Sequence, residues 1–283
     1  MASTVRILDQ VFSVEETLEG AGVRLHRGFG PAQVPRFDPF LLFDDFSSPQ
    51  PADYLAGFPW HPHRGIETVT YVLDGDVRHR DSIGNEGVIA QGDIQWMTAG
   101  SGIIHGEMPE GMGGLQGFQL WVNLPRGQKM MTPRYQEVKR KTIPEVRLGE
   151  HARGKVIAGK VAGVVGPVED IMASPLYVDI MLEPEKTLVL PVRDGDTVFL
   201  YIIDGALGTG SDDAIRYGKG LILLFDRGGD TVVIRAGGNG ARFLLVSGTP
   251  LGEQVAWRGP IVMNTEAELH TAFRELQEGT FIR

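Results

Sequence analysis

The sequence predicts an all-β protein made of two tandem β-barrel domains and a C-terminal helix. Three observations carry this prediction: the chain length, the alternation of strand-like runs with turn residues, and a repeated segment. The chain has 283 residues, whereas a single domain commonly has roughly 100–150. Its 38 glycines and 17 prolines separate short β-branched and aromatic runs, which is typical of short strands joined by tight turns.

The clearest strand candidates end in turn signals. Residues 68–73 precede Asp74-Gly75, and residues 197–203 precede Asp204-Gly205. Further strands are expected over residues 221–225, 231–234 and 242–246. This pattern predicts a β-sandwich or β-barrel.

A short repeat indicates that the barrel is duplicated. Tyr71-Val72-Leu73-Asp74-Gly75 resembles Tyr201-Ile202-Ile203-Asp204-Gly205, which begins 130 residues later. Residues 139–153 are rich in charge and poor in apolar anchors. We therefore expect an N-terminal metal-binding barrel over residues 1–138, a linker over 139–153, and a C-terminal barrel without a metal site over 154–283.

The C-terminal barrel is expected to end in a helix. Asn264 or Thr265 can cap this helix, Leu269 and Phe273 follow helical spacing, and Gly279 can end it.

The composition excludes several classes of protein and site. No apolar run approaches the roughly 18–20 residues of a membrane span, and the N-terminus lacks a secretory pattern, so we expect a soluble, cytoplasmic protein. The absence of cysteine excludes disulfides, iron–sulfur clusters and thiolate zinc sites. A net charge of −9 argues against direct nucleic-acid binding, which depends on basic residues.

Two pairs of residues predict a metal site in the N-terminal barrel. In His61-Pro62-His63 the imidazoles are two residues apart, so an extended backbone, favoured by Pro62, places them on one face. His105-Gly106-Glu107 repeats this spacing. An isolated His-x-His segment is usually a surface turn or a structural pair. Two pairs on adjacent strands could instead surround one ion with three imidazoles and a carboxylate, which suits divalent Fe, Mn, Co, Ni, Cu or Zn.

The second barrel lacks the corresponding residues. Shifting His61 and His63 by 130 residues leads to Pro191 and Arg193, and no histidine lies between His151 and His270. We therefore expect one metal ion per chain. His79 alternates with charged residues, so we expect it on a solvated strand face.

Five segments, in order along nearly the whole chain, resemble the pirin family. They are Phe37-Asp38-Pro39-Phe40-Leu41-Leu42-Phe43-Asp44-Asp45-Phe46, His61-Pro62-His63-Arg64-Gly65-Ile66-Glu67-Thr68-Val69-Thr70-Tyr71, Gly92-Asp93-Ile94-Gln95-Trp96-Met97-Thr98-Ala99-Gly100-Ser101-Gly102-Ile103-Ile104-His105, Leu120-Trp121-Val122-Asn123-Leu124-Pro125 and Gly259-Pro260-Ile261-Val262-Met263-Asn264-Thr265. The resemblance implies a bicupin, with two jelly-roll barrels of the double-stranded β-helix type and a metal ion in the first barrel only.

The resemblance also implies the ligands His61, His63, His105 and Glu107. The general cupin pattern instead uses a glutamate three residues beyond His-x-His, and Glu67 is the nearest candidate here. Glu67 has the strand parity of His63 unless Arg64-Gly65 interrupts the strand. We favour Glu107, because the pirin match is the closer one and Arg64-Gly65 can break that parity. We expect one ion, Fe(II), with the other first-row metals as alternatives.

The resemblance to pirin-like proteins implies the activity of a quercetin 2,3-dioxygenase. Such an enzyme cleaves flavonols with O2 and releases carbon monoxide. Glu107 would be the catalytic base that accepts the 3-hydroxyl proton. The alternative is a non-enzymatic, metal-dependent regulator that binds a transcription or metabolic partner. A third reading is an isomerase or sugar-binding cupin. Several apolar residues could line a substrate pocket or belong to the barrel core: Phe43, Phe46, Phe58, Trp60, Trp96, Met97 and Phe118.

Overall fold

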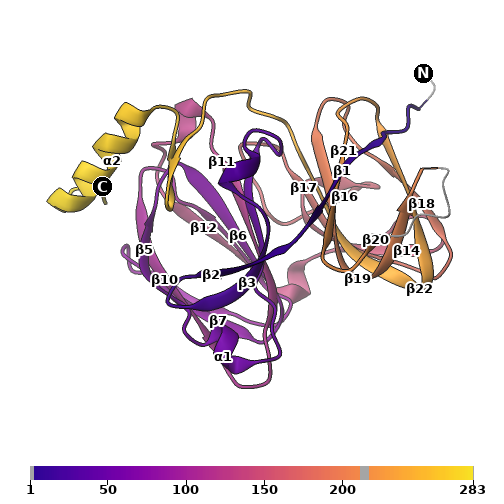
Figure 1. Ribbon diagram of the computed structural model, residues 1–283, viewed down its shortest axis with the longest axis horizontal. Helices are drawn as coiled ribbons and strands as arrows, with labels where there is room; N and C mark the ends of the chain where they lie inside the picture. Colours follow the sequence, from indigo (N-terminus) through magenta and orange to yellow (C-terminus); the bar gives the residue numbers. More distant parts are fainter. Residues whose placement is uncertain (1–2, 211–216, 283) are drawn as a thin grey trace. The chain divides into compact units, whose positions relative to one another are not determined.

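The computed structural model describes residues 3–210 and 217–282 (Figure 1). These residues are mostly in antiparallel strands, which confirms the all-β prediction. The chain divides into two compact units. We call the unit of Glu15–Arg140 and the segment from Leu251 onward the first barrel, and the unit of Lys141–Pro250 and the segment up to Val14 the second barrel. No described helix has the length and apolar character needed to cross a membrane.

Two antiparallel sheets form the first barrel, with strand orders β12-β9-β6-β11-β4-β3-β2 and β5-β10-β7-β8. The larger sheet contains β2 (Glu15–Glu19), β3 (Val23–Phe29), β4 (Phe40–Asp45), β6 (Ile66–Asp74), β9 (Ile94–Thr98), β11 (Gln116–Asn123) and β12 (Arg134–Val138). The smaller sheet contains β5 (Phe58–His63), β7 (Asp76–Asp81), β8 (Glu86–Ile89) and β10 (Ile103–Glu110). The short helices η1 (Pro31–Gln33), α1 (Pro51–Tyr54) and η2 (Arg126–Gln128) lie in connections.

The C-terminal segment of the first barrel contains a hairpin of β23 (Ala256–Arg258) and β24 (Ile261–Met263), followed by α2 (Glu266–Glu278). Thr265 caps α2, because its Oγ1 accepts from the Glu268 backbone N–H while the Glu268 carboxylate accepts from the Thr265 N–H. Gly279 ends the helix in the left-handed conformation, with φ of 73°. The predicted C-terminal helix is therefore confirmed.

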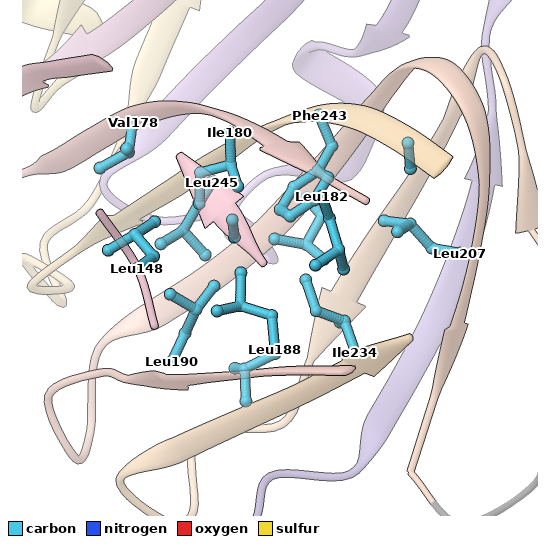
Figure 2. Close-up of a cluster of buried hydrophobic side chains, with 14 of the residues drawn as sticks. Leu148, Val178, Ile180, Leu182, Leu188, Leu190, Leu207, Ile234, Phe243 and Leu245 are labelled. Atoms are coloured by element: carbon cyan, nitrogen blue, oxygen red, sulfur yellow. The ribbon is translucent and has the colours of Figure 1, made fainter. Parts of the chain in front are cut away.

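The second barrel contains a nine-stranded sheet of order β1-β21-β19-β22-β17-β14-β13, with β18 paired to β22 and β20 to β19. Its strands are β1 (Leu8–Ser13), β13 (Glu145–Arg147), β14 (Ala152–Ala158), β17 (Leu176–Leu182), β18 (Thr187–Pro191), β19 (Thr197–Thr209), β20 (Tyr217–Gly218), β21 (Leu221–Phe225) and β22 (Thr231–Gly248). A small ladder joins β15 (Lys160–Val161) and β16 (Val164–Val165), and η3 (Arg140–Thr142) precedes β13. Apolar side chains from facing strands fill the interior (Figure 2).

The two ends of the chain belong to different units from those expected from the sequence. β1 pairs with β21, and the buried Arg6 donates to the Asp196 backbone oxygen at 2.6 Å, so the N-terminal segment is part of the second barrel. Conversely, the α2 residue Glu275 pairs with the buried Arg64 at 2.7 Å, so the helix is part of the first barrel. These contacts are long-range and leave no local signal in the sequence.

Residues 139–153 also differ from the expected linker. Within this range β13 pairs with β14 in the sheet of the second barrel, and Val146 and Leu148 are buried in its core. A three-residue strand between charged residues carries too little periodicity to be recognised from the sequence.

Candidate metal centre

The two predicted pairs of ligands lie on neighbouring strands. β5 pairs with β10 in antiparallel register, and His61 lies directly opposite His105. An irregularity in the ladder between His105 and Glu107 places Glu107 opposite Phe58. The structure thus brings the His-x-His and His-x-Glu segments together.

Three imidazoles converge on one point. One nitrogen each of His61, His63 and His105 lies within 4.8 Å of the others. His63 and His105 are each only 1% exposed, whereas His61 is half-buried. Burial, reinforced by the neighbouring histidines, lowers the pKa of His63 and His105 well below its ordinary value. Both rings are therefore neutral and can offer a lone pair to a cation.

The hydrogen bonds of His61 and His63 fix their tautomers. The Nδ1 of His61 lies 2.8 Å from the Pro59 carbonyl oxygen, and the Nδ1 of His63 lies 3.2 Å from the Pro260 carbonyl oxygen. A carbonyl only accepts, so both Nδ1 atoms carry the proton and both Nε2 atoms carry a lone pair. These Nε2 atoms are 3.0 Å apart. Two lone pairs facing each other at this distance repel unless a cation lies between them, and metal-bound histidines are typically oriented by such carbonyls.

His105 also fits a metal ligand. Neither of its ring nitrogens has a hydrogen-bond partner among the described residues, although both are buried. A buried polar atom without a partner is costly, and a coordinated cation would remove that cost. The three histidines therefore fit a divalent ion.

Glu107 lies beside this cluster, with its Oε2 4.0 Å from the His105 Nε2. Its Oε1 accepts a hydrogen bond from the Thr70 hydroxyl at 3.1 Å. Burial raises the pKa of Glu107, and the nearby His61 and the Thr70 hydrogen bond oppose this shift.

Glu67 lies elsewhere, on β6. Arg64 and Gly65 separate β5 from β6, and Gly65 has φ of 79°, so the parity that would align Glu67 with His63 is interrupted. Thr70 lines the cavity described below, and Glu67, three residues away on the same strand, faces the opposite side. There it accepts a hydrogen bond from Thr98 at 2.8 Å. The geometry favours Glu107 as the fourth ligand.

The histidine cluster opens into a cavity of about 590 Å³ within the first barrel, a size that suits a small molecule. Of the expected pocket residues, Phe46, Phe58 and Trp60 line it. The described lining does not include Phe43, Trp96, Met97 or Phe118, all of which are buried elsewhere. For Phe43 and Phe118 the reason is strand parity: they alternate with Leu42, Asp44 and Gln119, which do line the cavity.

The C-terminal hairpin supplies part of the cavity wall that sequence reasoning missed. Trp257, Gly259 and Pro260 line the cavity, and the Trp257 ring lies 5.9 Å from that of Trp121. Trp121 in turn meets the His63 ring edge-on at 5.1 Å. The only sequence signal for this wall was the Gly259-Pro260 segment of the family resemblance.

Two buried basic side chains, Arg64 and Lys129, hold the C-terminal segment in place. Arg64, which directly follows His63, donates to the Ser101 backbone oxygen at 2.6 Å and to the Phe281 backbone oxygen at 2.9 Å. Lys129 Nζ donates to the Gly65 oxygen at 2.9 Å and to the Val262 oxygen at 3.1 Å. These hydrogen bonds hold the segment that follows Pro260 against the first barrel.

His79 was expected on a solvated strand face because of its charged neighbours, and this prediction is wrong. It is 1% exposed, because β7 alternates exposed and buried residues and His79 falls on the buried side. It lies opposite Glu107 in the β7–β10 ladder, and its Nε2 contacts the Glu137 carboxylate at 3.0 Å. His79 therefore lies beside the candidate metal centre.

Comparisons with known proteins match nearly the whole chain. The Pirin family model matches residues 22–122, and the Pirin C-terminal cupin domain model matches residues 177–282. A pirin-like protein of Caulobacter vibrioides is 44% identical over 279 residues, covering 98% of this chain and 99% of its own. Pirin of Rattus norvegicus is 39% identical over 284 residues, covering 99% and 95%.

A solved structure shares the whole architecture. The crystal structure of quercetin 2,3-dioxygenase from Acinetobacter baumannii matches with a TM-score of 0.89 and 33% identity, over 98% of this chain and 99% of that one. With both family models and these relatives aligned along nearly its full length, the chain belongs to the pirin family, and its two barrels are cupin domains.

Proposed function

We propose that this protein is a metal-dependent dioxygenase that cleaves flavonols such as quercetin and releases carbon monoxide. The observation that carries the proposal is the pair of Nε2 lone pairs of His61 and His63, 3.0 Å apart at the wall of a mostly apolar cavity beside Glu107. The similarity to a quercetin 2,3-dioxygenase over the full chain supports the same activity.

His61, His63, His105 and Glu107 would hold the ion, which we propose to be Fe(II). Three imidazole nitrogens and one carboxylate oxygen suit first-row divalent ions, so manganese, nickel, cobalt, copper and zinc stay compatible with the ligand set.

A bound divalent ion would lower the pKa of a coordinated substrate hydroxyl and orient the substrate toward O2. The side chains around the cavity then determine which ligand binds and which group accepts its proton. Phe58, Trp60 and Trp121 provide an apolar wall that excludes water and favours a flat aromatic ligand.

Glu107 is positioned to accept the 3-hydroxyl proton of the flavonol. The Thr70 hydroxyl fixes one carboxylate oxygen, which leaves the other for the ion or the proton. Burial raises the pKa of Glu107 above its ordinary value, which makes this carboxylate a stronger base. The deprotonated flavonol then reacts with O2, the central ring opens, and one ring carbon leaves as carbon monoxide.

The test is carbon monoxide release per bound metal ion, measured for wild type, Glu107→Gln and the matched control Glu67→Gln. Glu107→Gln keeps an oxygen and the side-chain shape but removes the base, so turnover per metal should fall by at least about tenfold, because losing a general base costs roughly 10²–10⁴. Glu67→Gln should change turnover much less, since Glu67 faces the other side of β6.

Unchanged metal-normalised turnover in Glu107→Gln would contradict the base assignment. No flavonol cleavage by fully metallated wild type, with iron, manganese, nickel or copper, would instead favour the regulator that acts through a protein partner.

A further inference from the structure

A row of polar side chains crosses the cavity wall of the first barrel. Thr70 of β6 lies opposite Gln119 of β11, Gln119 opposite Asp44 of β4, and Asp44 opposite Arg27 of β3. Directly opposite residues point to the same face of a sheet, and all four residues line the cavity. With strands roughly 4.8 Å apart, the row extends over about 14 Å.

One end of the row is at the metal centre. The Thr70 Oγ1 lies 3.1 Å from Glu107 Oε1 and 3.0 Å from Gln119 Oε1. A hydroxyl donates one proton and can also accept, so Thr70 can donate to Glu107 while it accepts from the rotated amide group of Gln119. The remaining amide hydrogen and the carbonyl oxygen of Gln119 can then serve a ligand in the cavity.

The other end of the row is an ion cluster. Arg27 binds Asp44 through two parallel hydrogen bonds of 2.9 and 2.8 Å, and it binds Glu19, which also lines the cavity, at 2.9 Å. Burial disfavours the charged guanidinium, but the hydrogen bonds and charge of Asp44 outweigh it and raise the pKa of Arg27. Burial likewise raises the pKa of Asp44, but this bidentate pairing requires the carboxylate, so we treat it as ionised.

The cluster therefore combines one positive and two negative charges. Its net charge is −1, and Glu19 at 41% side-chain exposure retains access to the cavity. Carboxylate oxygens accept hydrogen bonds from neutral hydroxyl groups and repel anions. Between its two ends the cavity wall is mostly apolar, with Leu25, Leu42 and Phe46 among its members.

We propose that the Glu19–Arg27–Asp44 cluster is a second subsite of the cavity, which binds the neutral hydroxyl groups at the far end of an elongated polyphenol and rejects anionic ligands. The inference rests on the proposed function, because it assumes that the other end of the ligand is at the metal centre. A subsite of this kind would make uncharged polyhydroxylated aromatics the substrates of this protein, rather than their sulfonated or carboxylated derivatives.

Calorimetric titration of the metal-loaded protein without oxygen tests this subsite directly. Quercetin, 3-hydroxyflavone and a quercetin sulfonated on its remote ring share the chelating end and differ at the far end. We expect wild type to bind quercetin at least about tenfold more tightly than either of the others. Equal affinities for the three ligands, or no binding of any of them, would overturn the proposal.

Glu19→Gln isolates the charge of the cluster. It keeps a hydrogen-bonding side chain and removes the net negative charge, so the preference for quercetin over the sulfonate should shrink by about tenfold. Glu16→Gln is the matched control, because Glu16 is on the same strand, also pairs with an arginine, Arg24, and is not among the residues that line the cavity. An equal change in both variants would contradict the subsite.

The two proposals can fail separately. Selective binding of quercetin without carbon monoxide release would leave the subsite standing and refute the cleavage reaction. Cleavage of all three ligands with equal affinity would refute the subsite and leave the reaction standing.

Discussion

The two barrels repeat one fold but differ in what occupies their interiors. In the first barrel His61 lies opposite His105, and the space between the sheets is a cavity of about 590 Å³. The 130-residue shift from His61 leads to Pro191 in the second barrel, which lies opposite Thr231, and neither side chain is an ordinary metal ligand. Its interior is filled by side chains such as Leu190 and Leu245 (Figure 2).

The difference shows how a duplicated fold separates stability from chemistry. A cavity gives up packing contacts, and His105 gives up hydrogen bonds, since neither of its ring nitrogens has a partner among the described residues. A filled apolar interior gains both hydrophobic and packing energy. Both barrels have the same local backbone conformation at the turn that ends the repeated segment, with Gly75 at φ of 82° and Gly205 at 75°.

The largest expected effect is the loss of metal from the first barrel. His105→Ala removes a buried ligand, so bound metal should fall to near background, while the β-type circular dichroism stays intact. His151→Ala is the control, because this half-buried histidine pairs with Glu183 in the second barrel. Elemental analysis of both purified variants measures the effect. Stoichiometric metal in His105→Ala would place the site elsewhere.

Core truncations should have a smaller effect than loss of the metal, and here the second barrel should be the more sensitive of the two. Leu245→Ala in the filled interior should lower the free energy of unfolding by about 3 kcal/mol. Leu42→Ala should cost less, about 1–2 kcal/mol, because Leu42 faces an existing cavity that can readjust. Urea unfolding measures both, with metal content as a check that the site survives. Equal losses would indicate that the first barrel is packed as tightly as the second.

Local patterns in the sequence predicted much of the site. The i, i+2 spacing placed His61 with His63 on one face of a strand, and the capping residues located α2, because strand parity and helix caps depend only on near neighbours. The choice of Glu107 over Glu67 rested on the family resemblance and on an expected break at Arg64-Gly65, where β5 ends and Gly65 has φ of 79°.

The remaining features depend on residues far apart in the sequence. The Pro260 carbonyl reaches His63 across 197 residues. The prediction for His79 was wrong because it relied on the charged neighbours. In β7 exposed and buried residues alternate, and His79 is on the buried side. The polar row from Thr70 to Arg27 exists only through the strand order β6-β11-β4-β3, which no local pattern reveals.

The most direct test of the account is anomalous diffraction from crystals of the metal-loaded protein, recorded at the absorption edge of the metal. We predict one peak per chain, at roughly 2.0–2.3 Å from nitrogens of His61, His63 and His105 and from an oxygen of Glu107. A peak inside the second barrel, or one coordinated by Glu67 in place of Glu107, would contradict it.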